Sequence, residues 1–168
     1  QMLKDEVALS KEKMKKINLK LIVSSVVDDF NNIYEAKRGI QIILKDKNNQ
    51  EDFFINGIEN RIEQIIANLL DNSISFSENN KKILVELSKN EKEKIILKVI
   101  DEGKGFKETS TKKIFDRFYS NRPDNFGEHS GLGLNIVKNL VDLHGASIIA
   151  SNNITQKGAN VEIIFPKT

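Results

Sequence analysis

Apolar residues recur every three to four positions in three stretches of this chain, which is the spacing of an amphipathic helix. The stretches are residues 21–37, 57–76 and 132–144. Asn18 and Asn56 precede the first and second stretch, while Gly39 and Gly145 follow the first and third. Asn is a preferred N-cap and Gly a preferred helix-ending residue. The pattern therefore predicts three helices with these residues at their ends.

Shorter runs rich in Ile, Val and Phe lie between the helical stretches and predict β-strands. The runs are residues 40–44, 52–55, 83–88, 94–101, 147–151 and 160–165. The third and fourth are joined by a charged turn and predict a hairpin, and so do the last two, across Lys157-Gly158. Because helices and hairpins group rather than alternate, we expect an α+β fold: a two-layer sandwich of one mixed, mainly antiparallel sheet with helices on one face.

The first seventeen residues carry a different pattern. Leu3, Val7, Ser10, Met14 and Ile17 alternate at spacings of four and three among Lys and Glu, which predicts the end of a coiled-coil helix. We therefore expect two units, residues 1–17 and a domain of residues 18–168. Because the chain opens at Gln1 within this pattern, we expect a fragment of a longer protein. The alternative for residues 1–17 is a solvated tail.

Composition narrows the classes of function. The 26 basic and 24 acidic residues are mixed along 168 residues, so no clustered basic surface indicates nucleic-acid binding. The absence of cysteine excludes disulfides and thiolate metal sites. No apolar run approaches the ~20 residues of a membrane-spanning helix.

Two amides on the second predicted helix form the first candidate site. Asn68 and Asn72 are four positions apart and share one flank of the helix, at the border of its apolar face. An amide oxygen suits Mg²⁺, which takes few protein ligands and completes its shell with phosphate oxygens and water. The alternative is a pair of ordinary surface or packing amides.

Two glycine-rich turns form the second and third candidates. Residues 101–105 (DEGKG) follow a predicted strand, so Asp101 could accept a hydrogen bond from an exocyclic amine while Gly103 and Gly105 allow close backbone approach. Residues 130–134 (SGLGL) open the third helix, where free N–H groups and the helix dipole favour an anion. The alternatives are a simple glycine turn and a plain helix start with a close backbone contact.

The order of these motifs resembles the ATP-binding catalytic domain of sensor histidine kinases, in the GHKL superfamily. Residues 61–72 (RIEQIIANLLDN) are similar to the family's N box, residues 101–105 to its G1 box, residues 114–119 (IFDRFY) to its F box, and residues 130–134 to its G2 box. The resemblance runs from Asn18 to Phe165. The stretch 118–130 is similar to the lid of alphaproteobacterial envelope-sensing kinases. The resemblance implies a Bergerat-type ATP-binding fold.

The resemblance also implies a role for each matching residue. Asn72 would bind Mg²⁺ with Asn68 as a helper, Asp101 would contact adenine N6, and Phe76 would pack against the ring. The glycine positions would line the ligand: Gly103 and Gly105 at the adenine, and Gly131, Leu132 and Gly133 at the phosphates.

Two positions depart from the family pattern. Ser75 stands where a Lys is common, and Ser120 stands where an Arg is common. We expect Arg122 and Arg117 to supply the missing positive charge, because a guanidinium group suits phosphate oxygens. An ion pair on the lid is the alternative for Arg117.

The resemblance predicts a protein histidine kinase that transfers the γ-phosphoryl group of Mg-ATP to a histidine outside this chain. Neither His129 nor His144 has the acidic neighbour of the family's phosphoacceptor, and we expect both to be structural or lid residues. No catalytic residue is expected within this chain. The expected partners are the dimerisation and phosphotransfer domain of the same protein, which would be a homodimer, and a response regulator.

The resemblance places this chain as the cytoplasmic domain of an inner-membrane-anchored bacterial sensor. Two other functions stay open. One is a GHKL ATPase of the gyrase, mismatch-repair or chaperone type, although such enzymes typically carry a hydrolytic Glu just before the metal-binding Asn. The other is a degenerate nucleotide-binding regulatory module, supported only by Ser75 and Ser120.

Overall fold

The computed structural model describes residues 13–49, 52–106, 114–115, 132–154 and 156–168 of the chain. Five strands form one sheet in the order β2-β4-β5-β7-β6, in which β2 and β4 are parallel and every other neighbouring pair is antiparallel. The strands are β2 (Gln41–Asp46), β4 (Lys82–Lys89), β5 (Ile95–Asp101), β6 (Ser147–Asn152) and β7 (Ala159–Phe165).

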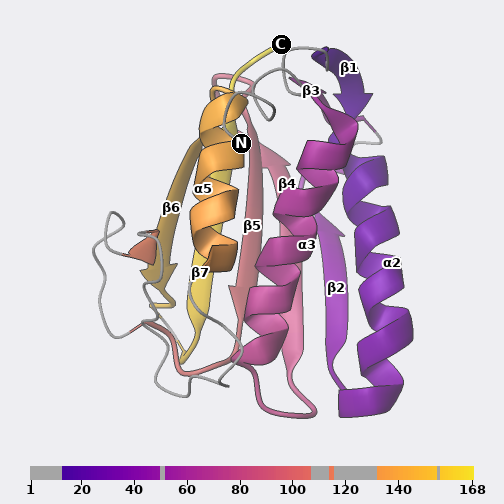
Figure 1. Ribbon diagram of the computed structural model, residues 1–168, viewed down its shortest axis with the longest axis vertical. Coiled ribbons are helices and arrows are strands. Elements are labelled where there is room, and N and C mark those ends of the chain that lie inside the picture. The colour runs from indigo at the N-terminus through magenta and orange to yellow at the C-terminus, as the bar shows by residue number, and fades with distance from the viewer. Residues whose placement is uncertain (1–12, 50–51, 107–113, 116–131, 155) are drawn as a thin grey trace, which may run out of the picture.

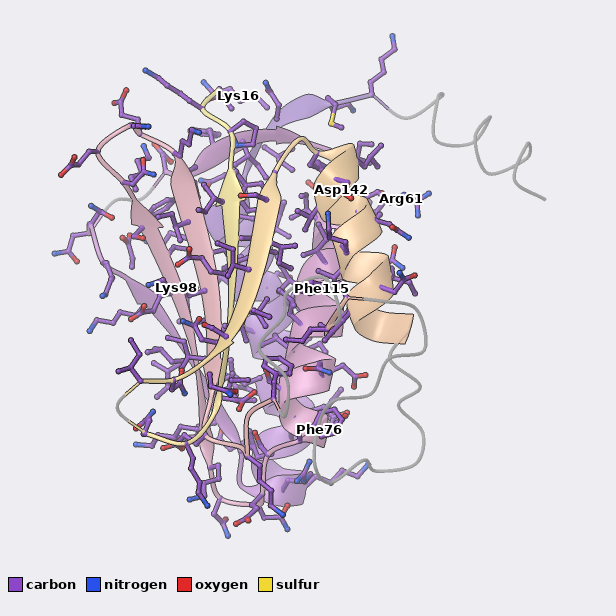
Figure 2. All side chains as sticks on the ribbon, turned by 90° about the vertical axis from the view of Figure 1, so that its left-hand side faces the viewer. Lys16, Arg61, Phe76, Lys98, Phe115 and Asp142 are labelled. Carbon is purple, nitrogen blue, oxygen red and sulfur yellow. The ribbon has the colours of Figure 1, made fainter. Side chains whose placement is uncertain are left out.

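Within the described ranges, three helices cover one face of this sheet, as Figure 1 shows. They are α2 (Leu19–Arg38), α3 (Glu59–Ser75) and α5 (Leu132–Leu143). In Figure 2 the labelled Lys98 of β5 projects from the opposite face, away from the helices. The predicted two-layer sandwich, with a mixed and mainly antiparallel sheet, is confirmed.

The core lies between the two layers. Buried and partly exposed residues alternate along β5, so that every second residue from Ile95 to Asp101 is buried. Opposite them α3 turns one face of Ile and Leu toward the sheet. These α3 residues are Ile62, Ile65, Ile66, Leu69 and Leu70, all at most 2% exposed. Because the period of two continues to the end of β5, Asp101 lies on the buried face although it is charged.

A separate two-stranded sheet corrects the prediction for the start of the chain. Lys15–Asn18 is strand β1, antiparallel to β3 (Phe54–Gly57), so the predicted helix is wrong at residues 15–17. Ile17 pairs with Ile55 in the β1–β3 ladder, which a helix could not form, and it also packs against the core. Met14 is 44% exposed. Leu3, Val7 and Ser10 lie outside the described residues.

The predicted caps are confirmed at α2 and wrong at the start of α3. The Asn18 side chain accepts the Lys20 N–H at 3.2 Å, and Gly39 ends α2 with φ of 66°. The N-cap of α3 is Ile58 instead of Asn56, and its side chain cannot serve as an acceptor. The Ile58 N–H instead donates to His144 Nε2 at 3.1 Å. A histidine from the end of α5 therefore replaces a local cap.

An asparagine of α2 occupies the outer edge of the sheet. Asn31 Nδ2 donates to the Ile42 carbonyl at 2.9 Å, and the Ile42 N–H donates to Asn31 Oδ1 at 2.8 Å. Strand β2 is an edge strand, whose outward backbone groups would otherwise be open to another chain. The Asn31 amide thus pairs with Ile42 as a neighbouring strand would.

Candidate functional site

Three of the predicted motifs lie at one end of the domain. The carboxyl end of β5, the C-terminal half of α3 and the first turn of α5 all lie toward the lower end in Figure 1. Helices α3 and α5 contact each other, and α3 also contacts β5. Residues from three separate parts of the sequence therefore converge on one region.

Asp101 is a buried carboxylate of this region, at 1% exposure. Its Oδ1 atom accepts the Gly103 N–H at 2.9 Å and the Ala159 N–H at 3.1 Å. A buried carboxylate without such donors would be costly. The two N–H groups provide these hydrogen bonds and hold the start of the following turn against β7.

The glycine turn, residues 102–105, follows Asp101 directly. Gly103 and Gly105 are buried, and Gly105 has φ of +81°, a region that L-residues rarely adopt. A Cβ at Gly105 would also lie 2.5 Å from Asn152 Oδ1. Glycine at position 105 is thus required by the turn and by its contact with β6, independently of any ligand.

The turn between β6 and β7 contributes residues that the sequence analysis missed. Asn152 and Asn153 hydrogen-bond the backbone at both ends of the glycine turn. Gly158 has φ of +136°, and any side chain there would overlap the Asp101 carbonyl oxygen. Only the Lys157-Gly158 turn was visible in the sequence; its contact with Asp101 depends on the β5–β7 pairing.

The amides predicted on α3 lie at the border of the core. Asn68 and Asn72 are both half-buried, between the fully buried Leu and Ile face and the solvent. Phe76 is the C-cap of α3 and is 8% exposed. Figure 2 shows Phe76 at the lower end of α3, on the helix side of the sheet. The Ser75 hydroxyl donates to the Asp71 carbonyl at 2.7 Å, within the same helix.

Arg38 holds this end of α3 in place and was also missed. Its Nη1 donates to the Ile74 carbonyl at 2.7 Å, its Nη2 to the Ser77 carbonyl at 2.5 Å, and its Nε to Asn79 Oδ1 at 2.7 Å. The last turn of α3 contains no basic residue of its own. A guanidinium from the end of α2 therefore satisfies the carbonyls and complements the negative end of the helix dipole.

The structure describes only part of the F box (residues 114–119) and of the second glycine motif (residues 130–134). Ile114 and Phe115 are buried, and Asn135 Nδ2 of α5 donates to the Phe115 carbonyl at 3.2 Å. Figure 2 shows Phe115 on the helix side of the sheet, above Phe76. Leu132 begins α5, and a Cβ at Gly133 would meet no described atom within 4 Å. Gly131, Arg117 and Arg122 lie outside the described residues.

The surroundings of Gly133 bear on the two interpretations of that glycine. A glycine needed for tight packing would have neighbours close to its missing Cβ, and in the described structure Gly133 has none. Among the described residues the space beside Gly133 is open, which is compatible with an anion at this helix N-terminus. Across the described ranges no three His, Cys, Asp or Glu side chains gather around a possible metal position.

Comparison with known proteins identifies the family. A model of the family described as histidine kinase-, DNA gyrase B- and HSP90-like ATPases matches residues 57–168. This chain belongs to that family. Membership makes ATP the expected ligand of this domain.

The relatives are sensor kinases. Sensor protein ChvG of Agrobacterium fabrum is 35% identical over 148 residues, which cover 84% of this chain and 25% of the relative. Sensor protein kinase PmrB of Pseudomonas aeruginosa is 29% identical over 157 residues, which cover 94% of this chain and 32% of the relative. The chain thus spans about a quarter to a third of the length of these curated relatives. The ChvG match agrees with the alphaproteobacterial branch that the lid sequence resembles.

Solved structures agree with the sequence relatives. The catalytic domain of histidine kinase ThkA superposes with a TM-score of 0.78 at 26% identity, covering 93% of this chain and 97% of that domain. ThkA in complex with response regulator protein TrrA gives a TM-score of 0.75 at 25% identity, covering 99% of this chain and 46% of that one. These matches confirm the resemblance to the sensor histidine kinase catalytic domain, and favour it over the two alternatives.

Across the described ranges, none of the helices combines the length and the apolar character needed to cross a bilayer.

Proposed function

We propose that this chain binds Mg²⁺-ATP between α3, the glycine turn and the start of α5, and presents the γ-phosphoryl group to a histidine on a dimerisation domain. The observation that carries this proposal is the buried Asp101 carboxylate at the end of β5, fixed by two backbone N–H groups, in a chain of an ATPase family. A fixed acceptor at that position suits the exocyclic amine of adenine.

In this proposal the two ends of the site have different tasks. At the adenine end, Asp101 accepts a hydrogen bond from N6, Phe76 packs against the ring, and Gly103 and Gly105 line it. At the phosphate end, Asn72 binds Mg²⁺ with Asn68 beside it. Phosphoryl transfer depends mainly on positioning and charge neutralisation, and the bound Mg²⁺ would supply part of that neutralisation.

The start of α5 would hold the phosphates. Gly131, Leu132 and Gly133 would offer backbone N–H groups at the positive end of the helix. The Ser75 hydroxyl bonds its own helix and brings no positive charge to the site. We therefore assign the missing charge to Arg122 and Arg117. If Arg122→Ala leaves both ATP affinity and phosphotransfer unchanged, Arg122 has no such role.

The decisive experiment is binding of a non-hydrolysable ATP analogue with and without Mg²⁺, measured by calorimetry. Asn72→Ala should weaken binding only when Mg²⁺ is present, because it removes a ligand of the metal. Asp101→Ala should weaken binding under both conditions, because adenine recognition needs no metal. If neither substitution weakens binding, the site has been placed wrongly.

The partners follow from the proposed reaction. The acceptor histidine would lie on a dimerisation domain outside this chain, with the residues that precede β1 as the end of that unit and the linker. The parent protein would be a membrane-anchored homodimer with this domain in the cytoplasm, and a response regulator would receive the phosphoryl group. Phosphorylation of a separately supplied dimerisation domain tests this, whereas steady hydrolysis without transfer would indicate an ordinary ATPase.

A further inference from the structure

We propose that Asn152 and Asn153, two consecutive amides at the end of β6, are positioning residues that fix the glycine turn for nucleotide binding. Neither residue of this amide pair is among the site residues assigned above. The inference rests on the proposed function, since it concerns how tightly the same site binds its nucleotide. It is carried by hydrogen bonds to both ends of the turn.

Asn152 holds the end of the glycine turn. Its Oδ1 atom accepts the Phe106 N–H at 2.6 Å, and its Nδ2 donates to the Phe106 carbonyl at 3.0 Å. One side chain thus satisfies both backbone groups of one residue, in the manner of a neighbouring strand. Phe106 itself is 5% exposed, so its backbone has little access to water as a replacement partner.

Asn153 holds the start of the turn. Its Nδ2 donates to the Asp101 carbonyl at 3.0 Å, while its own N–H donates to the Gly158 carbonyl at 2.9 Å. The same Asp101 is held at its carboxylate by the Ala159 N–H. The segment that leaves β6 and enters β7 therefore fixes the backbone and the side chain of Asp101 together.

The turn between these two anchors contains two glycines in four residues. Glycine has more conformational freedom than any other residue, so an unanchored turn of this composition would populate many conformations. Binding would then have to supply the entropy of ordering the turn, which lowers affinity. Because Asn152 and Asn153 order both ends in advance, we expect them to raise nucleotide affinity without contacting the nucleotide.

The test compares Asn152→Ala and Asn153→Ala with a matched control, Asn90→Ala. Asn90 Oδ1 accepts the Lys92 and Lys94 N–H groups in the β4–β5 turn, at the opposite end of β5 from Asp101. All three variants lose backbone hydrogen bonds in a turn. The dissociation constant of a non-hydrolysable ATP analogue and the denaturant midpoint would be measured for each variant.

We expect each alanine substitution in the amide pair to raise the dissociation constant by about tenfold. Asn90→Ala should leave the dissociation constant within about twofold of wild type, although it should lose about as much stability as the other two variants. Asn152→Asp keeps the acceptor for the Phe106 N–H but sets a carboxylate oxygen against the Phe106 carbonyl, so it should also weaken binding. The Asp variant can take the place of Asn152→Ala in this test if Asn152→Ala does not fold. Faster amide exchange at Phe106 in the Asn152 variants would show that the turn is released.

The outcomes separate this inference from the proposed function. If the wild-type chain does not bind the analogue, the proposed function fails and the role of the amide pair fails with it. If the wild-type chain binds and the Asn152 and Asn153 variants bind as tightly as Asn90→Ala, the amide pair only stabilises the fold and the positioning role is overturned.

Discussion

Asp101 and Ala159 are 58 positions apart in the sequence, yet the Asp101 carboxylate accepts the Ala159 backbone N–H at 3.1 Å. The same oxygen accepts the Gly103 N–H. The carboxylate therefore joins the end of β5, the glycine turn and the start of β7. Its structural role is additional to the adenine contact proposed for it, and two substitutions at this position separate the two roles.

Asp101→Asn should bind the ATP analogue at least about tenfold more weakly than wild type, which corresponds to about 1.4 kcal/mol, while unfolding close to wild type. An Asn side chain still offers one oxygen to the two N–H groups. Its amide nitrogen cannot accept a hydrogen from adenine N6. Calorimetric titration and urea unfolding measure the two effects.

Asp101→Ala should lose both functions, with about 1–3 kcal/mol less free energy of unfolding because buried N–H groups lose their acceptor. The pair of variants is diagnostic because only one of them keeps that acceptor. Wild-type affinity in Asp101→Asn would exclude the adenine contact, whatever the stability of Asp101→Ala.

His144→Phe should destabilise the domain by about 1–3 kcal/mol. His144 is 6% exposed; its Nε2 accepts the Ile58 N–H, and its Nδ1 lies 2.8 Å from the Leu140 carbonyl, to which it donates as the neutral tautomer. Phe has a similar volume and offers no acceptor to the first turn of α3. Urea unfolding measures the loss.

Leu143→Ala is the control for His144, because Leu143 is its exposed neighbour at the end of the same helix. The folded His144→Phe variant should bind nucleotide with unchanged affinity, because His144 contacts the start of α3 and Asn72 lies near its end. Equal stability of the two variants would contradict a capping role for the imidazole.

Arg38→Met should lower the free energy of unfolding by about 1–3 kcal/mol, since it removes charge-assisted hydrogen bonds to two carbonyls and to Asn79 at the end of α3. Met keeps much of the aliphatic stem. Arg38→Lys retains the charge but cannot reach three acceptors at once, so it should fall between Met and wild type. Thermal unfolding of the three proteins checks the order, and a Lys variant as unstable as Met would show that geometry alone matters.

The sequence predicted the elements well where one periodicity dominated. Helices α2, α3 and α5 and the β4–β5 hairpin follow from apolar spacing and from turn residues, and Asp101 could be placed because β5 keeps its alternation to its last residue. The start of the chain was misassigned because strand β1 carries a single apolar residue, Ile17, which the heptad spacing counted as its last position. Pairing with β3 decided the outcome, and pairing is a tertiary interaction that local spacing does not contain.

The supporting residues of the site could not be predicted for a similar reason. Asn152, Asn153 and Arg38 act on backbone groups more than thirty positions away. In the sequence they appear only as polar residues at element ends, which are common everywhere. The motif residues were accessible because their order resembles a family, while the residues that hold the motifs depend on strand register.

Asn31→Ala should reduce the free energy of unfolding by about 1–2 kcal/mol and increase self-association. Asn31 pairs with the N–H and the carbonyl of Ile42 on edge strand β2, so its removal leaves that edge open to another chain. Urea unfolding measures the first effect, and light scattering over a concentration series measures the second. Asn31→Asp is the matched control: it keeps the acceptor for the Ile42 N–H and adds an edge charge, so it should be destabilised without associating. Monomeric behaviour of Asn31→Ala at every concentration would show that β2 is protected by something other than this amide.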